Sequence, residues 1–312
     1  MRIAIYGTGA VGGYFGARLA QSGHDVWFIA RGEHLRAIRD GGLAVESVRG
    51  DFVVHPAQAT DEPSTIGPVD AVLLGVKSWQ VREACAAAAG MLGPETAVVT
   101  LQNGVEAPHH AAAAVGRERV LAGLVKVFAQ VAGPGRIRHT GPERIAFAEW
   151  DNAPSERVRR LRSALAEAGV TVDAPTDIWA ALWEKFLFVV PMGGIGAVAR
   201  APVGAIRGVP ETRAMLEAAM REILGVAHAH GVALPADVVD RTMAFVDTLP
   251  AAGTSSLQRD IAAGRPSELE AWSGAVARLG REAGVGTPVH AFIHHALLPL
   301  ERRARGELHF DD

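Results

Sequence analysis

The glycines of the segment Gly7-Thr8-Gly9-Ala10-Val11-Gly12, which fits G-x-G-x-x-G, are the first residues that suggest a chemistry. The segment follows an apolar strand pattern at residues 3–6 and opens a helical pattern, the setting in which it binds a dinucleotide. Gly7 allows a tight turn, Gly9 lets a pyrophosphate approach the backbone, and Gly12 lets helix and strand pack closely. Amides at the helix N-terminus attract the phosphates. The alternative is a tight turn that binds no ligand.

The end of the second strand pattern selects the cofactor. This pattern covers residues 25–30 and is followed by Arg31, 19 residues after Gly12. NAD-binding sites usually carry an acid at about this distance, which binds the ribose 2′-hydroxyl. Here the nearest acid is Glu33, whereas the Arg31 guanidinium suits a 2′-phosphate and can stack on adenine. The sequence therefore predicts NADPH/NADP+, with a solvated loop arginine as the alternative.

Composition narrows the class of protein. The chain has 312 residues, 49% apolar and 21% charged, which is enough for two ordinary domains. Its 31 basic and 34 acidic side chains give a formal charge of −3, so no nucleic acid partner is expected. The single cysteine, Cys85, excludes an internal disulfide. Because no apolar run reaches ~18 residues and no signal sequence is seen, we expect a cytoplasmic protein that does not contact a membrane.

Strand and helix patterns divide the chain into two halves. In the first half, helical patterns separate strand patterns, and a short hairpin is expected at 43–45 and 51–55; the strand patterns cover 3–6, 25–30, 71–75, 96–101, 120–127 and 145–147. This alternation indicates βαβ units and a parallel sheet. In the second half the patterns are helical, over 178–190, 211–229, 236–247, 269–283 and 288–303. We therefore predict an α/β fold, with an NADP(H)-binding Rossmann domain over residues 1–176 and an all-helical substrate domain over 177–312.

Further blocks follow the glycine loop and Arg31 in a fixed order: Lys77-Ser-Trp-Gln80, Leu101-Gln-Asn-Gly104, and Trp183-Glu-Lys185 with Ser256-Leu-Gln-Arg-Asp260 and Glu268-Leu-Glu270. As an ordered set, they resemble the ketopantoate reductase family (2-dehydropantoate 2-reductases) over nearly the whole chain. The resemblance implies a Rossmann domain, a helical domain and an active site in the cleft between them. It also implies hydride transfer from NADPH to the 2-keto group of ketopantoate, which yields pantoate for pantothenate biosynthesis.

Three residues take catalytic roles from this resemblance. Lys185 would be the general acid, because an ammonium beside the keto oxygen stabilises the alkoxide and can donate a proton. Glu268 would lie near the nicotinamide ribose and hold the lysine, and Asn103 would bind the substrate oxygen or the nicotinamide. The alternatives are a surface lysine, an acid in the first turn of a helix, and an Asn-Gly turn.

Other residues would contact the ligands. Lys77 and Gln80 would line the cofactor cleft, with ordinary surface residues as the alternative. Ser256 would hydrogen-bond the substrate, although a serine here could instead cap a helix. Asp260 is expected to pair locally.

The match to the family breaks in the expected substrate pocket. There the family carries asparagines four and eight residues after the lysine, whereas this chain has Val189 and Gly193. Pro191, between them, should kink the helix or end its regular hydrogen bonding. The pocket should be less polar, and roomier at Gly193. Either Ser255 or Ser256 supplies the missing hydrogen bonds, or the substrate is not ketopantoate.

Three functional hypotheses stay open. The first is a ketopantoate reductase, the second a related NADPH-dependent reductase of a bulkier or less polar keto substrate, and the third a nucleotide-binding protein without catalysis. We expect no metal at His109-His110, at His294-His295 or between His290 and His294, because adjacent helical residues point apart and two ligands do not make a site. The apolar C-terminal helices are compatible with a homodimer.

Overall fold

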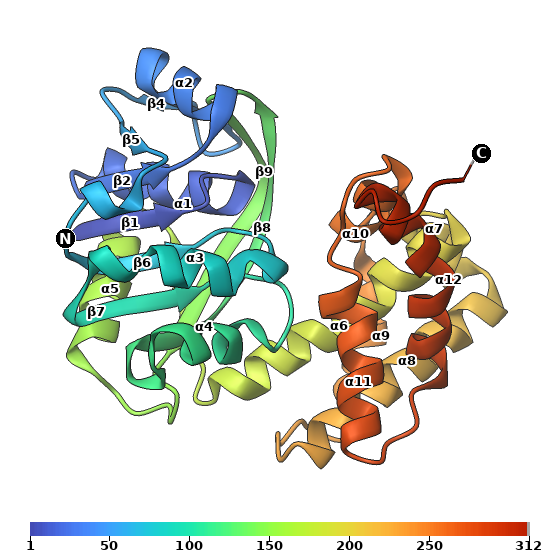
Figure 1. Ribbon diagram of the computed structural model, residues 1–312. Coiled ribbons are helices and arrows are strands. Elements are labelled where there is room, and N and C mark those ends of the chain that lie inside the picture. The colour runs from blue at the N-terminus through green and yellow to red at the C-terminus, as the bar shows by residue number, and fades with distance from the viewer. Residues whose placement is uncertain (311–312) are drawn as a thin grey trace. The chain divides into compact units, whose positions relative to one another are not determined.

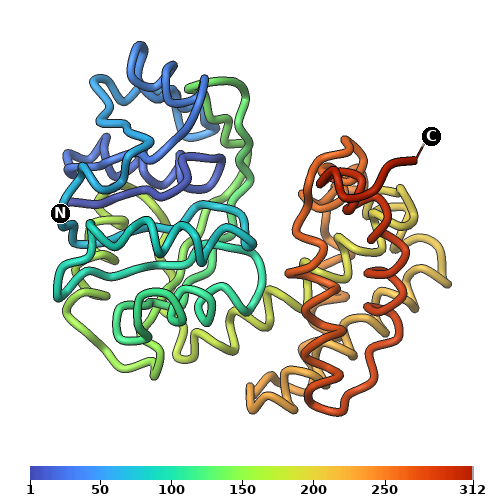
Figure 2. Tube along the Cα trace, viewed as in Figure 1, coloured from blue at the N-terminus to red at the C-terminus, as the bar shows by residue number. Residues whose placement is uncertain are grey.

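The structure is a computed structural model that describes residues 1–310 of the chain. The chain forms two compact units, the first over Met1–Ile178 and the second beginning at Trp179. It passes from one unit to the other once, along a long helix, as the trace in Figure 2 shows. The roles expected for the two parts, cofactor binding over residues 1–176 and substrate binding over 177–312, stay predictions.

Unit 1 is built on a sheet that holds ten strands within the described residues, in the order β4-β3-β9-β8-β7-β6-β1-β2-β5 with β10 beside β9. The strands are β1 (Arg2–Tyr6), β2 (Asp25–Ile29), β3 (Leu43–Ser47), β4 (Phe52–Val54), β5 (Gln58–Thr60), β6 (Val69–Leu74), β7 (Leu92–Thr100), β8 (Val120–Gly133), β9 (Arg136–Ala148) and β10 (Thr171–Asp173). All pairs from β5 to β8 along this order are parallel, which confirms the predicted sheet. The expected hairpin of β3 and β4 is also confirmed.

The chain order of the strands reverses at β1. This strand pairs with β2 on one side and with β6 on the other. In sheets of this kind, ligands bind beyond the carboxyl ends of the strands at such a reversal. The residues that follow β1, which are those of the glycine loop, therefore start at the position that favours a nucleotide.

Helices cover both faces of this sheet, as Figure 1 shows. They are α1 (Ala10–Gln21), α2 (Gly32–Gly41), α3 (Val81–Ala87), α4 (Ala107–Val115) and α5 (Glu156–Glu167). Side chains of β1 alternate between two cores: Ile3 and Ile5 pack with α1, α2 and α5, and Ala4 and Tyr6 pack with α3 and α4. Burial on both faces explains why residues 3–6 of β1 and 71–74 of β6 are apolar throughout.

The antiparallel pair of β8 and β9 is longer than the sequence indicates. Strand patterns are apparent only over 120–127 and 145–147, whereas the strands extend over 120–133 and 136–148. In the extra part, buried side chains such as Ile137 and His139 alternate with exposed ones. Backbone pairing between the two strands stabilises this half-exposed part. Because it has no continuous apolar run, the sequence pattern did not indicate it.

Unit 2 contains only helices within the described residues. They are α6 (Ile178–Ala199), α7 (Val203–Gly208), α8 (Pro210–Ala229), α9 (Val238–Thr248), α10 (Ser256–Ala262), a π-helical turn (Glu270–Gly274), α11 (Ala275–Glu282) and α12 (Pro288–Ala304). The all-helical second half is therefore confirmed.

Helix α6 continues through Pro191 to Ala199, so the helical pattern predicted over 178–190 is too short, and an end of the helix at this proline is wrong. A kink at Pro191, the other expected effect, stays a prediction. Proline removes one backbone hydrogen bond, but apart from Glu184 and Lys185 this helix is apolar, and burial of its apolar side chains stabilises it. It is long and apolar enough to cross a membrane by length and composition, yet 61% of its most apolar window is buried in the protein. Such burial is typical of a core helix.

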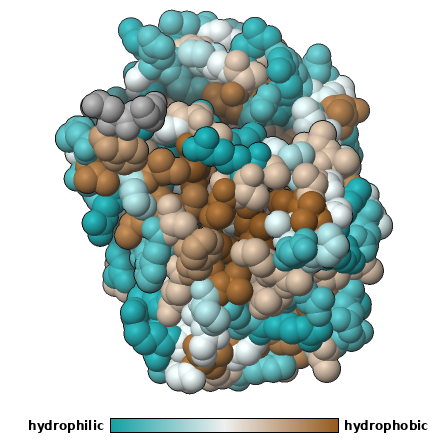
Figure 3. Space-filling model, turned by 90° about the vertical axis from the view of Figure 1, so that its right-hand side faces the viewer, coloured by the Kyte–Doolittle hydropathy of each residue, from teal (hydrophilic) through white to brown (hydrophobic). Residues whose placement is uncertain are grey.

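Apolar side chains gather on one face of the molecule, as Figure 3 shows. In unit 2, Phe245 on α9 and Phe292 on α12 are 50% and 56% exposed. The ring of Phe188, on α6, lies 5.2 Å from that of Phe245. Exposed apolar patches often mark interaction surfaces. The homodimer expected from the sequence stays a prediction.

The buried histidine of α12 should make unit 2 sensitive to acid. Complete burial lowers the pKa of His290 from its usual 6.5 to about 4. Between these values the unfolded chain binds a proton that the folded chain does not, so stability is complete above pH 6.5 and falls as the pH drops towards 4. At pH 5 the loss should be about 2 kcal/mol.

Urea denaturation at pH 7 and pH 5 measures this loss. His290→Gln should show a smaller fall between the two pH values than the wild type. Equal falls in the two proteins would show that His290 does not contribute.

Candidate active site

The glycine loop requires glycine at two positions for steric reasons. Gly7 has φ +97°, and a Cβ there would lie 2.7 Å from the backbone nitrogen of Val76. A Cβ on Gly12 would lie 2.3 Å from the carbonyl oxygen of Gly7. One on Gly75, at the end of β6, would lie 2.5 Å from the same oxygen. Close approach of β1, β6 and α1 therefore depends on these residues, and the sequence prediction missed Gly75.

Gly9 differs from these glycines, because a Cβ built on it meets nothing within 4 Å. It is the N-cap residue of α1 and supplies no side-chain cap. The first amides of α1 therefore have no side-chain cap, and a group of negative charge is favoured at this end of the helix. Room above Gly9 together with uncapped amides fits the pyrophosphate of a dinucleotide.

Hydrogen bonds tie the start of this loop to β2. The carbonyl oxygen of Ile29 accepts from the backbone nitrogens of Gly7 and Thr8 at 3.3 and 3.1 Å, and from Thr8 Oγ1 at 3.0 Å. The side chain of Thr8 is buried. Hydrogen bonds within the protein thus restrain the start of the turn.

Arg31 lies at the carboxyl end of β2, where it is the N-cap residue of α2. Its side chain is 70% exposed, and its Nη2 lies 3.8 Å from Oε1 of the equally exposed Glu83. Ion pairs between exposed side chains are weak, so a phosphate can compete with this carboxylate. The guanidinium thus lies at the end of β2, where the sequence predicts the 2′-phosphate.

Two loops follow the next strands at the same edge of the sheet. Lys77 lies between β6 and a 3₁₀ turn (Ser78–Gln80), and its backbone nitrogen donates to Gln80 Oε1 at 3.3 Å. Asn103 is half-buried after β7, followed by Gly104 with φ +122°. Parallel pairing of β1, β2, β6 and β7 therefore brings the expected cofactor residues of unit 1 to a common edge.

Gln102, next to Asn103, has a role that was not predicted from the sequence. It is buried, and its Nε2 donates to the carbonyl oxygens of Leu74 at 2.8 Å and Val76 at 2.9 Å. Its Oε1 accepts from the nitrogen of Leu101 at 3.1 Å. The amide thus joins the ends of β6 and β7 and holds the loop of Asn103. Its position within the Leu101–Gly104 block is the feature of the sequence that could have indicated this role.

In unit 2, α6 carries three of the expected residues. Lys185 and Val189 are half-buried and Gly193 is buried. A Cβ on Gly193 would lie 2.4 Å from Cζ3 of Trp272 and 3.1 Å from Ser255 Oγ. The buried Trp272 indole fills the space beside this glycine, so the expectation of a roomier pocket at Gly193 is wrong. The sequence offers no signal for this contact, because the two residues belong to distant helices.

Ser255, rather than Ser256, caps α10. Its Oγ accepts from the backbone nitrogen of Gln258 at 3.0 Å, and Ser256 is the first residue of the helix. The alternative in which Ser256 is the cap is therefore wrong. Asp260 pairs with Arg265 at 2.8 Å, which confirms the expected local pairing.

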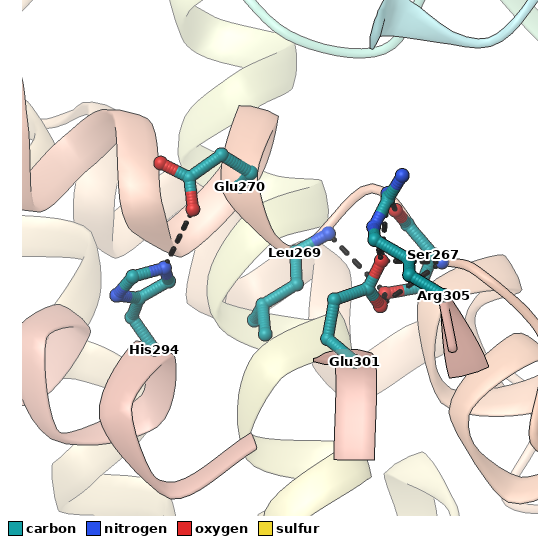
Figure 4. A network of polar contacts seen from close by, with 6 residues as sticks. All are labelled: Ser267, Leu269, Glu270, His294, Glu301 and Arg305. Carbon is teal, nitrogen blue, oxygen red and sulfur yellow. Dashed lines mark hydrogen bonds and ion pairs between the residues drawn. The ribbon is translucent and has the colours of Figure 1, made fainter. Parts of the chain in front are cut away.

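Glu268 is 7% exposed and lies in a segment held by the network in Figure 4. The buried carboxylate of Glu301 accepts from the nitrogen and the hydroxyl of Ser267 and, at 2.7 Å, from Arg305 Nε. Ser267 Oγ in turn accepts from the nitrogen of Leu269 at 3.3 Å. These hydrogen bonds restrain the residues on both sides of Glu268. Nothing in the sequence indicated that Glu301 takes part in them.

Two histidines of α12, His290 and His294, make hydrogen-bonding contacts within the protein. His294 Nε2 lies 2.8 Å from Glu270 Oε2, and this hydrogen bond lowers the pKa of Glu270. His290 Nε2 contacts the carbonyl oxygen of Ala219 at 3.1 Å. Within residues 1–310 no group of three or more His, Cys, Asp and Glu side chains could hold a metal ion.

Comparisons with known proteins agree with this architecture. Residues 3–152 match the family model "Ketopantoate reductase PanE/ApbA", and residues 177–301 match its C-terminal counterpart. A 2-dehydropantoate 2-reductase of Mesorhizobium japonicum is 32% identical, with 97% of each chain covered. A PanE/ApbA family ketopantoate reductase structure from Ralstonia eutropha has a TM-score of 0.90 at 32% identity, covering 98% of this chain and 100% of that one.

A D-mandelate dehydrogenase solved with NADH and anilino(oxo)acetate has a TM-score of 0.89, covering 98% of this chain and 99% of that one. At 22% identity it shows the shared fold alone. Together with the glycine loop, the sequence relatives indicate a nicotinamide dinucleotide cofactor. The chain therefore belongs to the ketopantoate reductase family, whose members are oxidoreductases that act on CH–OH groups.

Proposed function

We propose that this enzyme reduces a 2-keto acid to a 2-hydroxy acid with NADPH, and that ketopantoate is its substrate in pantothenate biosynthesis. The observation that carries the proposal is the open, uncapped glycine loop with an exposed arginine at the end of the neighbouring strand. Relatives named 2-dehydropantoate 2-reductase support the choice of substrate. Family membership argues against a protein without catalysis. A cytoplasmic location belongs to the same proposal.

The proposed roles follow from the chemistry of the reduction. Bound NADPH supplies the hydride that adds to the keto carbon. The cofactor would be held by Gly7–Gly12, Arg31, Lys77 and Gln80. Lys185 would donate a proton to the resulting alkoxide oxygen, and Asn103 would hold the keto oxygen or the nicotinamide amide. Glu268 would keep the ammonium of Lys185 in position.

Replacement of the proposed acid tests the mechanism. Lys185→Ala should lower kcat/KM for the keto acid by about 10²–10⁴-fold, the usual contribution of a positioned acid. NADPH affinity, measured by titration without substrate, should stay within about twofold. The matched control is Lys126→Ala, which removes an exposed lysine of β8. Turnover of Lys185→Ala at the wild-type rate would exclude the assignment.

Cofactor preference depends on Arg31. Arg31→Ala should raise the KM for NADPH by about 10–100-fold, because one charge-assisted contact to the 2′-phosphate is lost. The KM for NADH should change little, since that cofactor lacks the phosphate. Arg36→Ala, which removes an exposed arginine within α2, is the control. A wild-type enzyme that uses both cofactors equally would contradict the preference.

A second candidate is a reductase of the same family for a bulkier or less polar 2-keto acid. Val189 favours a less polar substrate, because its side chain supplies no hydrogen bond for a substrate hydroxyl. The Trp272 ring beside Gly193 gives a bulkier substrate no added room at that position. Steady-state kinetics with ketopantoate and larger apolar 2-keto acids separates the two. We expect kcat/KM for ketopantoate above about 10⁴ M⁻¹s⁻¹; a value below about 10³, with a larger acid preferred, would favour the second candidate.

The same assay tests whether the contact between Gly193 and the Trp272 ring affects turnover of the keto acid. Gly193→Ala places a methyl group against the Trp272 ring and should lower kcat/KM for all the acids. Gly225→Ala is the control, since its Cβ would meet only Val285 at 3.4 Å.

A further inference from the structure

His34, on α2, connects the glycine loop to the turn between β8 and β9. Its Nε2 lies 2.7 Å from the carbonyl oxygen of Thr8, and its Nδ1 lies 3.0 Å from the backbone nitrogen of Gly135. Gly135 forms the turn between β8 and β9 with φ +67°, and its own carbonyl accepts from the nitrogen of Ala44 at 2.9 Å. A chain of contacts thus runs from β3 through the imidazole to the loop.

These two contacts define the protonation of the ring. A backbone N–H can only donate, so Nδ1 accepts from Gly135 and carries no proton. In the neutral imidazole the proton then lies on Nε2, which donates to the Thr8 carbonyl. Both contacts are satisfied together by this tautomer of the neutral ring.

The bond to Thr8 orients a peptide group of the cofactor loop. In a trans peptide the C=O and the following N–H point in opposite directions. When the Thr8 carbonyl points to His34, the N–H of Gly9 points away from it. Ile29 holds the nitrogen and the hydroxyl of Thr8 but not its carbonyl. Because Gly9 has no side chain to restrict rotation, this peptide needs another restraint.

We propose that His34 is a positioning residue for the cofactor, which holds the Thr8–Gly9 peptide so that the Gly9 N–H faces the pyrophosphate. The inference rests on the proposed function, because it assigns the glycine loop to the dinucleotide. His34 itself does not touch the reacting atoms. Its contribution is a loop that is already ordered when the cofactor arrives, so less ordering entropy is lost on binding.

Two amide variants separate the two ends of the imidazole. The amide nitrogen of His34→Gln can replace Nε2 as the donor to Thr8. His34→Asn is too short to reach Thr8 but can accept from Gly135 in place of Nδ1. The dissociation constant of NADPH is measured by calorimetric titration without substrate, followed by kcat at saturating NADPH.

His34→Asn should weaken NADPH binding about tenfold, the effect of one lost hydrogen bond. His34→Gln should stay within about threefold of the wild type, and kcat should change little in both. Asp40→Asn, an exposed position at the other end of α2, is the control and should bind as the wild type does. Equal NADPH binding by His34→Asn and wild type, or equally weak binding by both amide variants, would overturn the inference.

A spectroscopic measurement keeps the test independent of the variants' folding. The ¹⁵N spectrum of histidine rings in the cofactor-free wild type should show His34 as the Nε2–H tautomer. An Nδ1–H tautomer would overturn the inference. A wild-type protein that binds no dinucleotide would refute the proposed function itself, whereas failure of the variant pattern alone leaves that function intact.

Discussion

Unit 1 depends on the close packing of Gly7, Gly12 and Gly75 around one carbonyl oxygen, that of Gly7. A side chain on Gly12 or Gly75 would occupy the space that this oxygen needs. Because neither is present, α1 can begin directly against the ends of β1 and β6. Its free amides then face the point where strand order reverses, the position at which sheets of this class bind nucleotides.

Around this contact, hydrogen bonds within unit 1 hold the loops of the candidate cofactor site. The carbonyl of Ile29 holds the start of the glycine loop, His34 holds its next peptide, and the buried Gln102 holds the loop of Asn103. Ordering a loop costs conformational entropy, and a loop ordered during folding does not lose that entropy again on binding. The candidate cofactor site is therefore largely formed in advance by hydrogen bonds of unit 1.

In unit 2, hydrogen bonds to a buried carboxylate hold a segment of the candidate site in place. Glu301 is 4% exposed, and hydrogen bonds from Ser267 and Arg305 satisfy its carboxylate. A buried carboxylate is costly unless it is bonded in this way, so the segment that carries Glu268 is firmly held. A few residues later, Trp272 packs against Gly193, and an aromatic ring takes the space that a side chain of α6 would otherwise fill.

Much of the fold and part of the site could be predicted from the sequence, because local spacing reflects local geometry. The alternation of strands and helices, the glycine loop and the absence of an acid at Arg31 are all contained in short segments. The full helix α6, the filled space at Gly193 and the cap at Ser255 were decided by the tertiary structure. Each of these, like the contact of His34 with Thr8, depends on which distant side chains pack together, and sequence spacing carries no such distance.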